Sequence, residues 1–356
     1  TMMGRSRSEL GSHLLPSISI IVVSGLIPAL ACAQTSLGPL HTSEQNPLYR
    51  LLYVPDSEPA DPVREGTLRV DFSTSYSNVF EASERRHHAY LFDLEQMTNS
   101  LTLRWGLGTS LELGARVGLY TGWEGFMDPV ISGFHNFFGL PNGGRESQPE
   151  DQYRLDLEHI DLEEGSVDLG SDRRIFSLED VRFHAKWRFL GGNGGRVGMS
   201  LRGALRRAGG PLDEGRLDGA VSLLGRLSAN SFHFHGSTGL TVANSPSELN
   251  SITSDQALLF SGTIEYGLRP ELSLMGQLSG STSYFKRFDG GDLDGIPLNL
   301  TFGASGFTGG SWGWQVSLTE DLLSTGPSVD FTLDFGLSHT FLGSSTEGGD
   351  RVAAAP

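Results

Sequence analysis

The sequence predicts an all-β protein, a single transmembrane antiparallel β-barrel of about 12 strands with a short loop helix near residues 128–138. Three observations lead to this prediction. A long segment near the C-terminus alternates strictly between apolar and polar residues, eleven further segments show the same period, and the connections between segments alternate between short and long. Alternation with period two puts one face of each strand towards lipid and the other towards water.

The alternating segment near the C-terminus covers residues 329–341. Its odd positions hold Val329, Phe331, Leu333, Phe335, Leu337, His339 and Phe341, and its even positions hold Asp330, Thr332, Asp334, Gly336, Ser338 and Thr340. All the bulk therefore lies on one face, as a wall between lipid and water requires. The last strand of a soluble β-sandwich is the alternative for this segment taken alone.

The N-terminus has the pattern of a secretory signal. Arg5 and Arg7 precede an apolar run broken by Pro16 and Pro28, and small residues follow at 31–33. A basic start, a short apolar run and a small-x-small ending predict a signal peptide over residues 1–33, cleaved between Ala33 and Gln34. A spanning helix and lipid attachment at Cys32 are the alternatives, but the run is short and interrupted by proline.

The composition of the chain argues against several classes of site and partner. Cys32 is the only cysteine, so a mature chain without it has neither a disulfide nor a thiolate metal site. The net charge of −16 argues against a nucleic-acid partner, which needs a basic face. No further apolar run reaches the length of a membrane helix, so only a closed barrel could satisfy the backbone in a membrane.

The order of the chain gives four parts: the signal, a periplasmic lead or inward-folded plug over 34–65, the barrel over 66–341 and a flexible tail over 342–356. Alternating segments fall near 68–76, 90–106, 111–119, 181–189, 197–205, 221–227, 232–242, 258–266, 272–278, 298–302, 312–318 and 329–341. Turns after even-numbered segments are brief and connections after odd-numbered ones are longer, as expected when both chain ends face the periplasm.

Three short motifs resemble a known bacterial family. They are Gln45-Asn46-Pro47-Leu48, Ser77-Asn78-Val79-Phe80 and Phe134-His135-Asn136-Phe137-Phe138-Gly139-Leu140-Pro141, and they are similar to the family of domain of unknown function 3187. The resemblance spans nearly the whole mature chain. It implies export and a place in the bacterial outer membrane, with outer-membrane lipid as a partner, and it carries no catalytic residue.

The end of the last segment resembles the closing strand of outer-membrane barrels. Gly336, His339 and Phe341, with Asp334 before them, match the recurring pattern of a polar residue, a glycine, an aromatic residue and a final Phe. The resemblance implies that the barrel-insertion machinery reads this end as an assembly signal. The tail after Phe341 departs from barrels that stop at their final Phe.

Charged residues on the polar faces predict a basic lumen. The set comprises Arg116, Arg182, His184, Lys186, Arg202, Arg226 and His233, with Glu112 and Glu265 as acidic partners. A water-filled lumen with this wall would favour anions. The alternative is a network of paired charges that fills a narrow barrel.

The predicted loop helix is a candidate gate or constriction. Asp128-Pro129 is typical of a helix start, and the apolar residues at helical spacing include Met127, Ile131, Phe134, Phe137 and Phe138. Folded inward, the helix would narrow the lumen. The alternative is a helix that packs on the barrel rim and covers its own apolar side chains.

Other chemistry finds little support. The acidic, non-periodic segment 146–174 is predicted to be a solvated loop, with calcium binding as the alternative. The chain holds no H-E-x-x-H motif, and we expect no enzyme activity, catalytic residue, metal or cofactor. The working hypothesis is a passive channel for small solutes. Transport of a hydrophobic compound and a plugged structural or interaction barrel are the alternatives.

We expect Phe341→Ala to impair barrel assembly strongly, because the last strand must pair with the first to remove both sheet edges. Deletion of residues 342–356 is the matched control and should be tolerated. The measurement is the fraction of protein that migrates as folded barrel in unheated gel samples. Loss of folding in the deletion alone would show that the assembly signal lies beyond Phe341.

Overall fold

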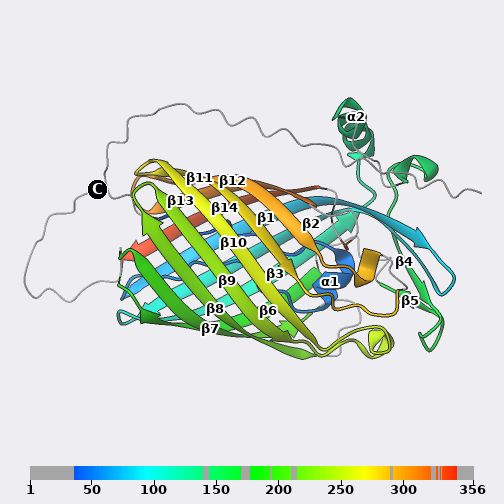
Figure 1. Cartoon of the computed structure of the whole chain (residues 1–356), viewed down its shortest axis with the longest axis horizontal. Helices are drawn as coiled ribbons and strands as arrows, with labels where there is room; N and C mark the ends of the chain where they lie inside the picture. Colours follow the sequence, from blue (N-terminus) through cyan, green and yellow to red (C-terminus); the bar gives the residue numbers. More distant parts are fainter. Residues whose placement is uncertain are drawn as a thin grey trace, which may run out of the picture. The chain divides into compact units, whose positions relative to one another are not determined.

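The computed structural model describes residues 36–138, 144–169, 177–192, 195–209, 215–288, 292–321, 326–327, 329 and 331–342. Its main element is a closed antiparallel barrel of twelve strands (Figure 1). The strands are β1 (Thr67–Glu84), β2 (His88–Leu107), β3 (Leu111–Trp123), β6 (Ser177–Leu190), β7 (Val197–Ala208), β8 (Leu217–Ala229), β9 (Phe232–Val242), β10 (Gln256–Arg269), β11 (Leu272–Ser281), β12 (Leu298–Thr308), β13 (Trp312–Asp321) and β14 (Phe331–Leu342). The predicted fold class is confirmed.

Closure joins the two ends of the sheet. β1 pairs with β2 on one side and with β14 on the other, in a register that runs from Thr67 opposite Leu342 to Asn78 opposite Phe331. Alternation then separates the two faces. Leu201 is 43% exposed on the outside while its neighbour Arg202 is 5% exposed on the inside. The same contrast recurs around the barrel, so the outer surface is an apolar band suited to lipid.

The two ends of the barrel differ in their connections. Short turns join β2 to β3, β6 to β7, β8 to β9, β10 to β11 and β12 to β13, and we call this the turn end. Longer connections gather at the opposite loop end, with one exception. β1 and β2 stay paired up to Glu84 opposite Ala89, so the first connection is a protruding hairpin with a short turn, and not the long loop that the sequence suggested.

The acidic segment after the third strand is more regular than predicted. It forms β4 (Arg154–His159) and β5 (Ser166–Asp168), which add to the protruding part of β2. The prediction of a non-periodic loop was wrong for β4, because Leu155 and Leu157 alternate with charged residues and are buried. Pairing with β2 supplies backbone partners that the sequence pattern does not reveal. The remainder of this segment, 170–174, lies outside the described residues.

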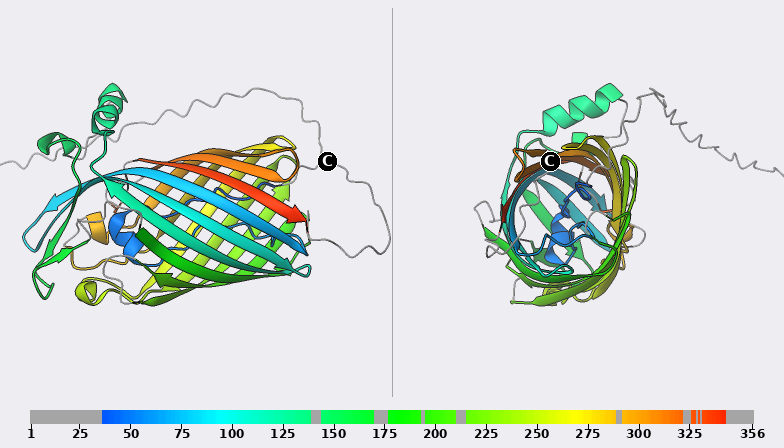
Figure 2. Two further views of the ribbon diagram at one scale, coloured as in Figure 1. Left: turned by 180° about the vertical axis from the view of Figure 1, so that it is seen from behind. Right: turned by 90° about the vertical axis from the view of Figure 1, so that its left-hand side faces the viewer.

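Residues 36–65, here called the inner segment, lie inside the barrel. Figure 2 shows the helix α1 (Pro47–Leu51) within the ring of strands. Asn46 caps this helix by accepting hydrogen bonds from the backbone N–H groups of Leu48 and Tyr49. At the loop end α1 packs into an apolar core with the hairpin and loops, whose members include Tyr49, Phe92, Leu157, Tyr284 and Phe288.

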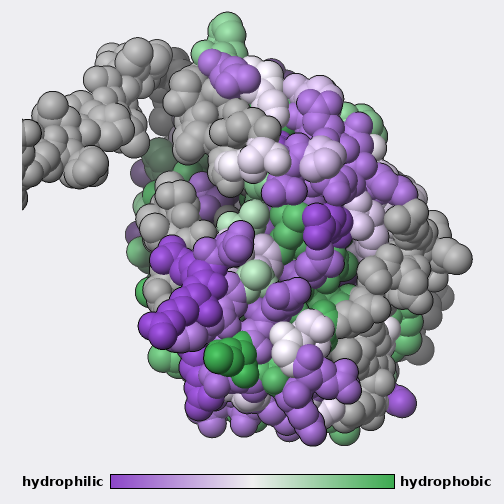
Figure 3. All heavy atoms as spheres, turned by 90° about the vertical axis from the view of Figure 1, so that its right-hand side faces the viewer, coloured by the Kyte–Doolittle hydropathy of each residue, from purple (hydrophilic) through white to green (hydrophobic). Residues whose placement is uncertain are grey.

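Other helices are short. α2 (Asp128–Phe138) lies outside the ring of strands (Figure 2). Three 3₁₀ turns cover Arg145–Ser147, Ser247–Leu249 and Asp292–Asp294. None of the helices in the described ranges combines the length and the apolar character needed to cross a membrane. The loop end, seen in Figure 3, presents mainly hydrophilic residues around a smaller hydrophobic patch.

A charge on the outer face at mid-strand should destabilise the barrel. Leu223 lies midway along β8 and is 38% exposed, so we expect Leu223→Arg to lower the free energy of unfolding by about 2–4 kcal/mol. The measurement is the urea midpoint of the heat-dependent gel shift in lipid bilayers. Leu223→Phe is the control and should behave like the wild type. An unchanged midpoint for the arginine variant would contradict a lipid-facing position.

Candidate functional site

The inner face divides into a cationic half and a neutral half. Strands β2, β3, β6, β7 and β8 carry the cationic half, because their inward positions hold basic residues. All of the residues predicted to line the lumen are buried on the inner face: Arg116, Arg182, His184, Lys186, Arg202, Arg226, His233, Glu112 and Glu265. Period two alone accounts for this placement, since their strand neighbours face outward.

Asp56 of the inner segment joins two strands of the cationic half. Its Oδ2 lies 2.9 Å from Arg116 Nη1 of β3 and 3.3 Å from Arg182 Nη1 of β6. Arg182 also contacts Asp180 through its Nε at 2.7 Å. Burial keeps water and salt from screening the attraction between this carboxylate and the two guanidiniums, but it also removes the hydration of all three groups.

Glu58 is the most connected carboxylate of the inner segment. It lies 3.1 Å from Lys186 Nζ, 3.3 Å from Arg202 Nη2 and 3.7 Å from Arg104 Nη2. Lys186 Nζ also contacts Glu112 Oε1 at 2.9 Å, so this ammonium stands between two carboxylates. One inner-segment side chain thereby links β2, β6 and β7.

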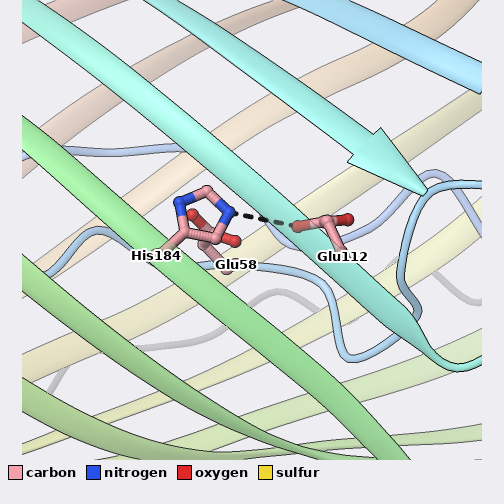
Figure 4. Close-up of side chains that lie close together, drawn as sticks. All are labelled: Glu58, Glu112 and His184. Atoms are coloured by element: carbon pink, nitrogen blue, oxygen red, sulfur yellow. Dashed lines mark hydrogen bonds and ion pairs between the residues drawn. The ribbon is translucent and has the colours of Figure 1, made fainter. Parts of the chain in front are cut away.

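Glu58, Glu112 and His184 come close enough together to hold a metal ion (Figure 4). His184 Nε2 lies 3.2 Å from Glu112 Oε1. However, Lys186 already supplies a positive charge to both carboxylates, and Arg104 and Arg202 add two more to Glu58. A divalent cation would meet three neighbouring cations here. We therefore interpret the cluster as part of the ion-pair network.

Asp61 completes the series nearer the turn end. Its Oδ2 lies 2.6 Å from Arg226 Nε of β8, and its Oδ1 lies 3.3 Å from Arg188 Nη1 of β6. Val63 follows on the chain and donates its backbone N–H to Glu112 Oε2 at 2.7 Å. Residues 56–63 are therefore held along the cationic half at several levels of the barrel.

The helix α1 is fixed to the same half at the loop end. Arg206 of β7 donates to the carbonyls of Arg50 and Leu51, at 2.8 and 3.2 Å, which are groups that the end of a short helix leaves without partners. Its guanidinium also contacts Asp180 and Asp218. Arg50 pairs with Glu179 at 3.1 Å. The C-terminal end of α1 is thus bound to β6 and β7.

The remaining predicted lumen residues meet near the turn end. Glu265 accepts hydrogen bonds from Ser36 Oγ and from the Leu37 backbone N–H, both at 2.8 Å. It also lies 3.0 Å from His235 Nε2. His233 instead contacts Ser228 through Nδ1 at 2.8 Å. Glu265 therefore binds the start of the inner segment, whereas Glu112 pairs with basic residues of the cationic half.

The neutral half is formed mainly by strands β9 to β14, whose inward positions are rich in Ser, Thr, Gln and Gly. Gln277 of β11 donates to Thr42 Oγ1 at 3.0 Å and to Ser57 Oγ at 3.3 Å. Gln315 of β13 exchanges two hydrogen bonds with the backbone of His41. Leu40 packs against Gly303, where an added Cβ would come within 2.9 Å of it. Neutral contacts replace ion pairs on this side.

The predicted gate helix does not enter the lumen. α2 lies outside the ring of strands in Figure 2, and Phe137 is 82% exposed. Ile131 is buried and Met127 is half-buried, while the side chains of Phe134 and Phe138 lie outside the described residues. Asp128 anchors the start of the helix through Arg145. In this structure the inner segment, and not α2, occupies the barrel.

The predicted assembly residues lie at the seam of the barrel. Phe341 pairs with Leu68, His339 with Val70 and Gly336 with Ser73 across the β1–β14 contact. His339 Nε2 also lies 3.2 Å from Ser311 Oγ. The predicted signal-cleavage site and the tail after Leu342 lie outside the described residues.

Sequence reasoning missed several residues of this site. Asp56, Glu58 and Asp61 were not singled out, because the inner segment has no regular period and its irregular chain gives no face to assign. Period two also predicts an inward position for three further basic residues, which could have been included for that reason: Arg104, Arg188 and Arg206. The excess of basic residues on the inner face was a signal that acidic partners were needed elsewhere.

Electrostatics support a charged, docked inner segment. Burial alone would raise the pKa of Asp56, but Arg116 and Arg182 together hold that pKa below its ordinary value. For Glu58 the effect of burial is likewise outweighed by Arg104, Arg202 and Lys186, and its pKa is well below the ordinary value. Burial lowers the pKa of His41, and Arg104 and Arg116 add to this effect. Burial raises the pKa of Glu44.

Comparison with known proteins agrees with the geometry. The closed twelve-strand barrel with an apolar outer band defines an outer-membrane β-barrel protein. A family model described as a protein of unknown function (DUF3187) matches residues 14–341, and the chain belongs to this family. The resemblance seen in the sequence is thereby confirmed. No curated protein matches the chain.

Solved structures of outer-membrane channels and porins are similar to the chain. The COG4313 outer membrane channel from Pseudomonas putida F1 is similar over 79% of this chain and 98% of its own, with a TM-score of 0.52 and 14% sequence identity. The NanC porin is similar over 76% of this chain and 98% of its own, with a TM-score of 0.44 and 8% sequence identity. The KdgM porin is similar over 77% of this chain and 99% of its own, with a TM-score of 0.41 and 7% sequence identity. At these identities the similarity concerns the fold.

We expect docking of the inner segment to weaken as pH falls. The lowered pKa of His41 means that the undocked state takes up a proton first, so docking weakens below about pH 6.5. The lowered pKa values of Asp56 and Glu58 add a steeper loss below about pH 4, towards their docked values. Glu44 acts in the opposite direction, since its pKa is raised, and opposes His41 above about pH 4.5, so the main loss falls below about pH 4, where Asp56 and Glu58 act together.

The measurement for this prediction is hydrogen–deuterium exchange of peptides from residues 40–63 between pH 7 and 3.5, corrected for the intrinsic exchange rate. Peptides from β11 and β12 serve as the internal control and should keep their protection. Equal protection of the inner segment over the whole pH range would refute the prediction.

Proposed function

We propose that this protein is an outer-membrane channel for small solutes and that its own N-terminal segment closes it to ions at rest. The observation that carries the proposal is the match between the inner segment and the cationic half of the lumen. Three carboxylates, Asp56, Glu58 and Asp61, contact seven basic side chains: Arg104, Arg116, Arg182, Lys186, Arg188, Arg202 and Arg226.

Physical reasoning favours closure over a purely structural role. Buried ion pairs are weak stabilisers of a fold, since desolvation offsets much of their attraction, and apolar packing would hold a permanent plug at least as well. The polar interface of residues 56–63, in contrast, allows this part of the segment to leave the wall without exposing an apolar surface. The cationic half would then face a wet lumen and attract anions.

The proposal includes the orientation of the barrel in the membrane. The turn end would face the periplasm and the loop end the outside, because outer-membrane barrels have short periplasmic turns and longer external loops. Cleavage of the signal between Ala33 and Gln34 would leave the mature N-terminus beside Ser36, which contacts Glu265 near the turn end. The inner segment would therefore be released towards the periplasm. Insertion by the barrel-assembly machinery belongs to the same proposal.

The hydrophobic-compound alternative receives less support. An apolar path would need apolar side chains inside the barrel, whereas the inner face carries charged groups on one half and hydroxyl and amide groups on the other. The exposed apolar residues of α2 lie outside the ring. We therefore propose polar solutes as the cargo, with no catalytic step and no cofactor.

The test is conductance in planar bilayers. We expect Asp56→Asn with Glu58→Gln and Asp61→Asn to raise the mean conductance at least about ten-fold and to favour anions, because the segment loses its partners and the arginines become free. Adding Arg202→Glu and Arg226→Glu should shift the reversal potential towards cations.

The matched control neutralises three acids of the β4–β5 region: Asp156→Asn with Glu158→Gln and Asp161→Asn. Asp156 and Asp161 are exposed and pair only with Arg154 and Arg287 among the ion pairs described. The control should conduct like the wild type. If neutralising the inner-segment carboxylates also leaves conductance at the wild-type level, the segment does not close a channel.

A further inference from the structure

The neutral half of the lumen retains space beside the docked inner segment. Two cavities of about 90 and 80 Å³ lie between the inner segment and the wall. The first is bordered mainly by β1, β2 and β12 to β14, and the second by β7 to β14. The free space therefore lies mainly beside the neutral half, and Arg104 of β2 and Arg202 of β7 border it at the edges of the cationic half.

The two cavities follow each other along the barrel. The first reaches Leu37 and Trp314, close to the turn that precedes β13. The second reaches Pro297, just before β12, and Val329, both at the loop end. Both are bordered by Ser57, so they adjoin at this residue. Ser57 accepts a hydrogen bond from Gln277, which also donates to Thr42 at the second cavity.

Hydroxyl groups are the commonest polar groups in the lining of the second cavity, which includes Ser222, Ser237, Ser261, Ser279, Thr301 and Thr319. A serine or threonine hydroxyl both donates and accepts, so such a surface matches any orientation of another hydroxyl. The first cavity continues the pattern with Ser73, Ser305 and Ser338. At about 10–15 Å³ for each water molecule, each cavity holds roughly six waters, or a short polyol in their place.

The charges that border the cavities are already paired. Arg202 contacts Glu58, Asp56 contacts Arg116, and Arg104 contacts both Glu58 and Asp71. Glu44 accepts the backbone N–H groups of Gln45 and Asn46, and burial raises its pKa. A charged solute would therefore lose its hydration without gaining an unpaired counter-charge, whereas a neutral solute has no such cost.

Two buried acceptors at the second cavity have no hydrogen-bond partner among the described residues. They are Gln45 Oε1 and Asp56 Oδ1, and both residues border this cavity. Buried acceptors of this kind are costly unless a donor satisfies them. A hydroxylated solute carries such donors at short intervals along its chain.

We propose that the hydroxyl-lined half of the lumen is a path for small neutral polyhydroxylated solutes, open while the inner segment is docked. This inference rests on the proposed function only in taking the barrel to be a channel. It does not require the inner segment to move. The cationic half and its carboxylates would hold the segment aside, and Gln277 would pass the solute from one cavity to the next by exchanging hydrogen bonds.

The experiment is swelling of proteoliposomes in erythritol, with the four-carbon acid threonate as the charged solute of matched size. We expect the intact protein to pass erythritol well above protein-free liposomes and to pass threonate at least about ten-fold more slowly. Ser279→Trp, which fills the second cavity, should lower the erythritol rate about five-fold or more. Leu278→Trp is the matched control, because it adds the same bulk to the lipid-facing neighbour and should leave the rate unchanged.

A crosslinked form separates this inference from the proposed closure. Ser200 Oγ donates to the Ala60 carbonyl on the cationic half, so Ala60→Cys with Ser200→Cys brings two thiols into neighbouring positions, and the oxidised fraction is the form to test. The oxidised form should keep the erythritol rate. A rate equal to that of protein-free liposomes, an unchanged rate in Ser279→Trp, or loss of erythritol passage on oxidation would each overturn the inference. The conductance of the neutralised variant tests closure independently.

Discussion

The pairing of buried arginine and lysine side chains with carboxylates is the interaction on which the rest of the structure depends. The lipid around the barrel forces these cations inward, because a charge at mid-depth on the outer face costs about 2–4 kcal/mol. Inside a narrow lumen they repel one another unless acids stand between them. The barrel wall supplies some of these acids, such as Glu112 and Asp180. The inner segment supplies the others through Asp56, Glu58 and Asp61.

This constraint explains the asymmetry of the lumen. The cations gather on neighbouring strands, so a chain that carries the complementary charges is drawn to one side. The opposite wall makes mainly neutral contacts, such as those of Gln277 and Gln315, and Glu265 adds a carboxylate at the start of the segment. Small inward residues such as Gly303 give side chains of the inner segment, here that of Leu40, room to approach the wall. Ion pairs, neutral hydrogen bonds and hydroxyl-lined space therefore arise from one arrangement of charge.

The loop end follows a different principle. There α1 is buried in an apolar core made by the β1–β2 hairpin, β4 and the loops, and Arg206 binds the free carbonyls at its C-terminal end. The hairpin continues past the barrel because its inward residues, such as Phe92 and Leu94, have this core to pack against. The inner segment is thus held by charge along the lumen and by apolar packing at the loop end, which is why acid should loosen its middle first.

The sequence by itself determined the barrel, since period two over twelve segments fixes which side chains meet lipid and which face inward, and lipid tolerates no unpaired sheet edge. It also determined that Arg116, Lys186, Arg202 and Arg226 point inward. Only the tertiary structure decided what these residues meet. The contacts of Asp56, Glu58 and Asp61 join residues far apart in the chain through an irregular segment without a period, so no local pattern records them. The same holds for β4, whose strand exists because β2 offers it an edge, and for α2, whose apolar spacing predicted a helix but not its position outside the ring.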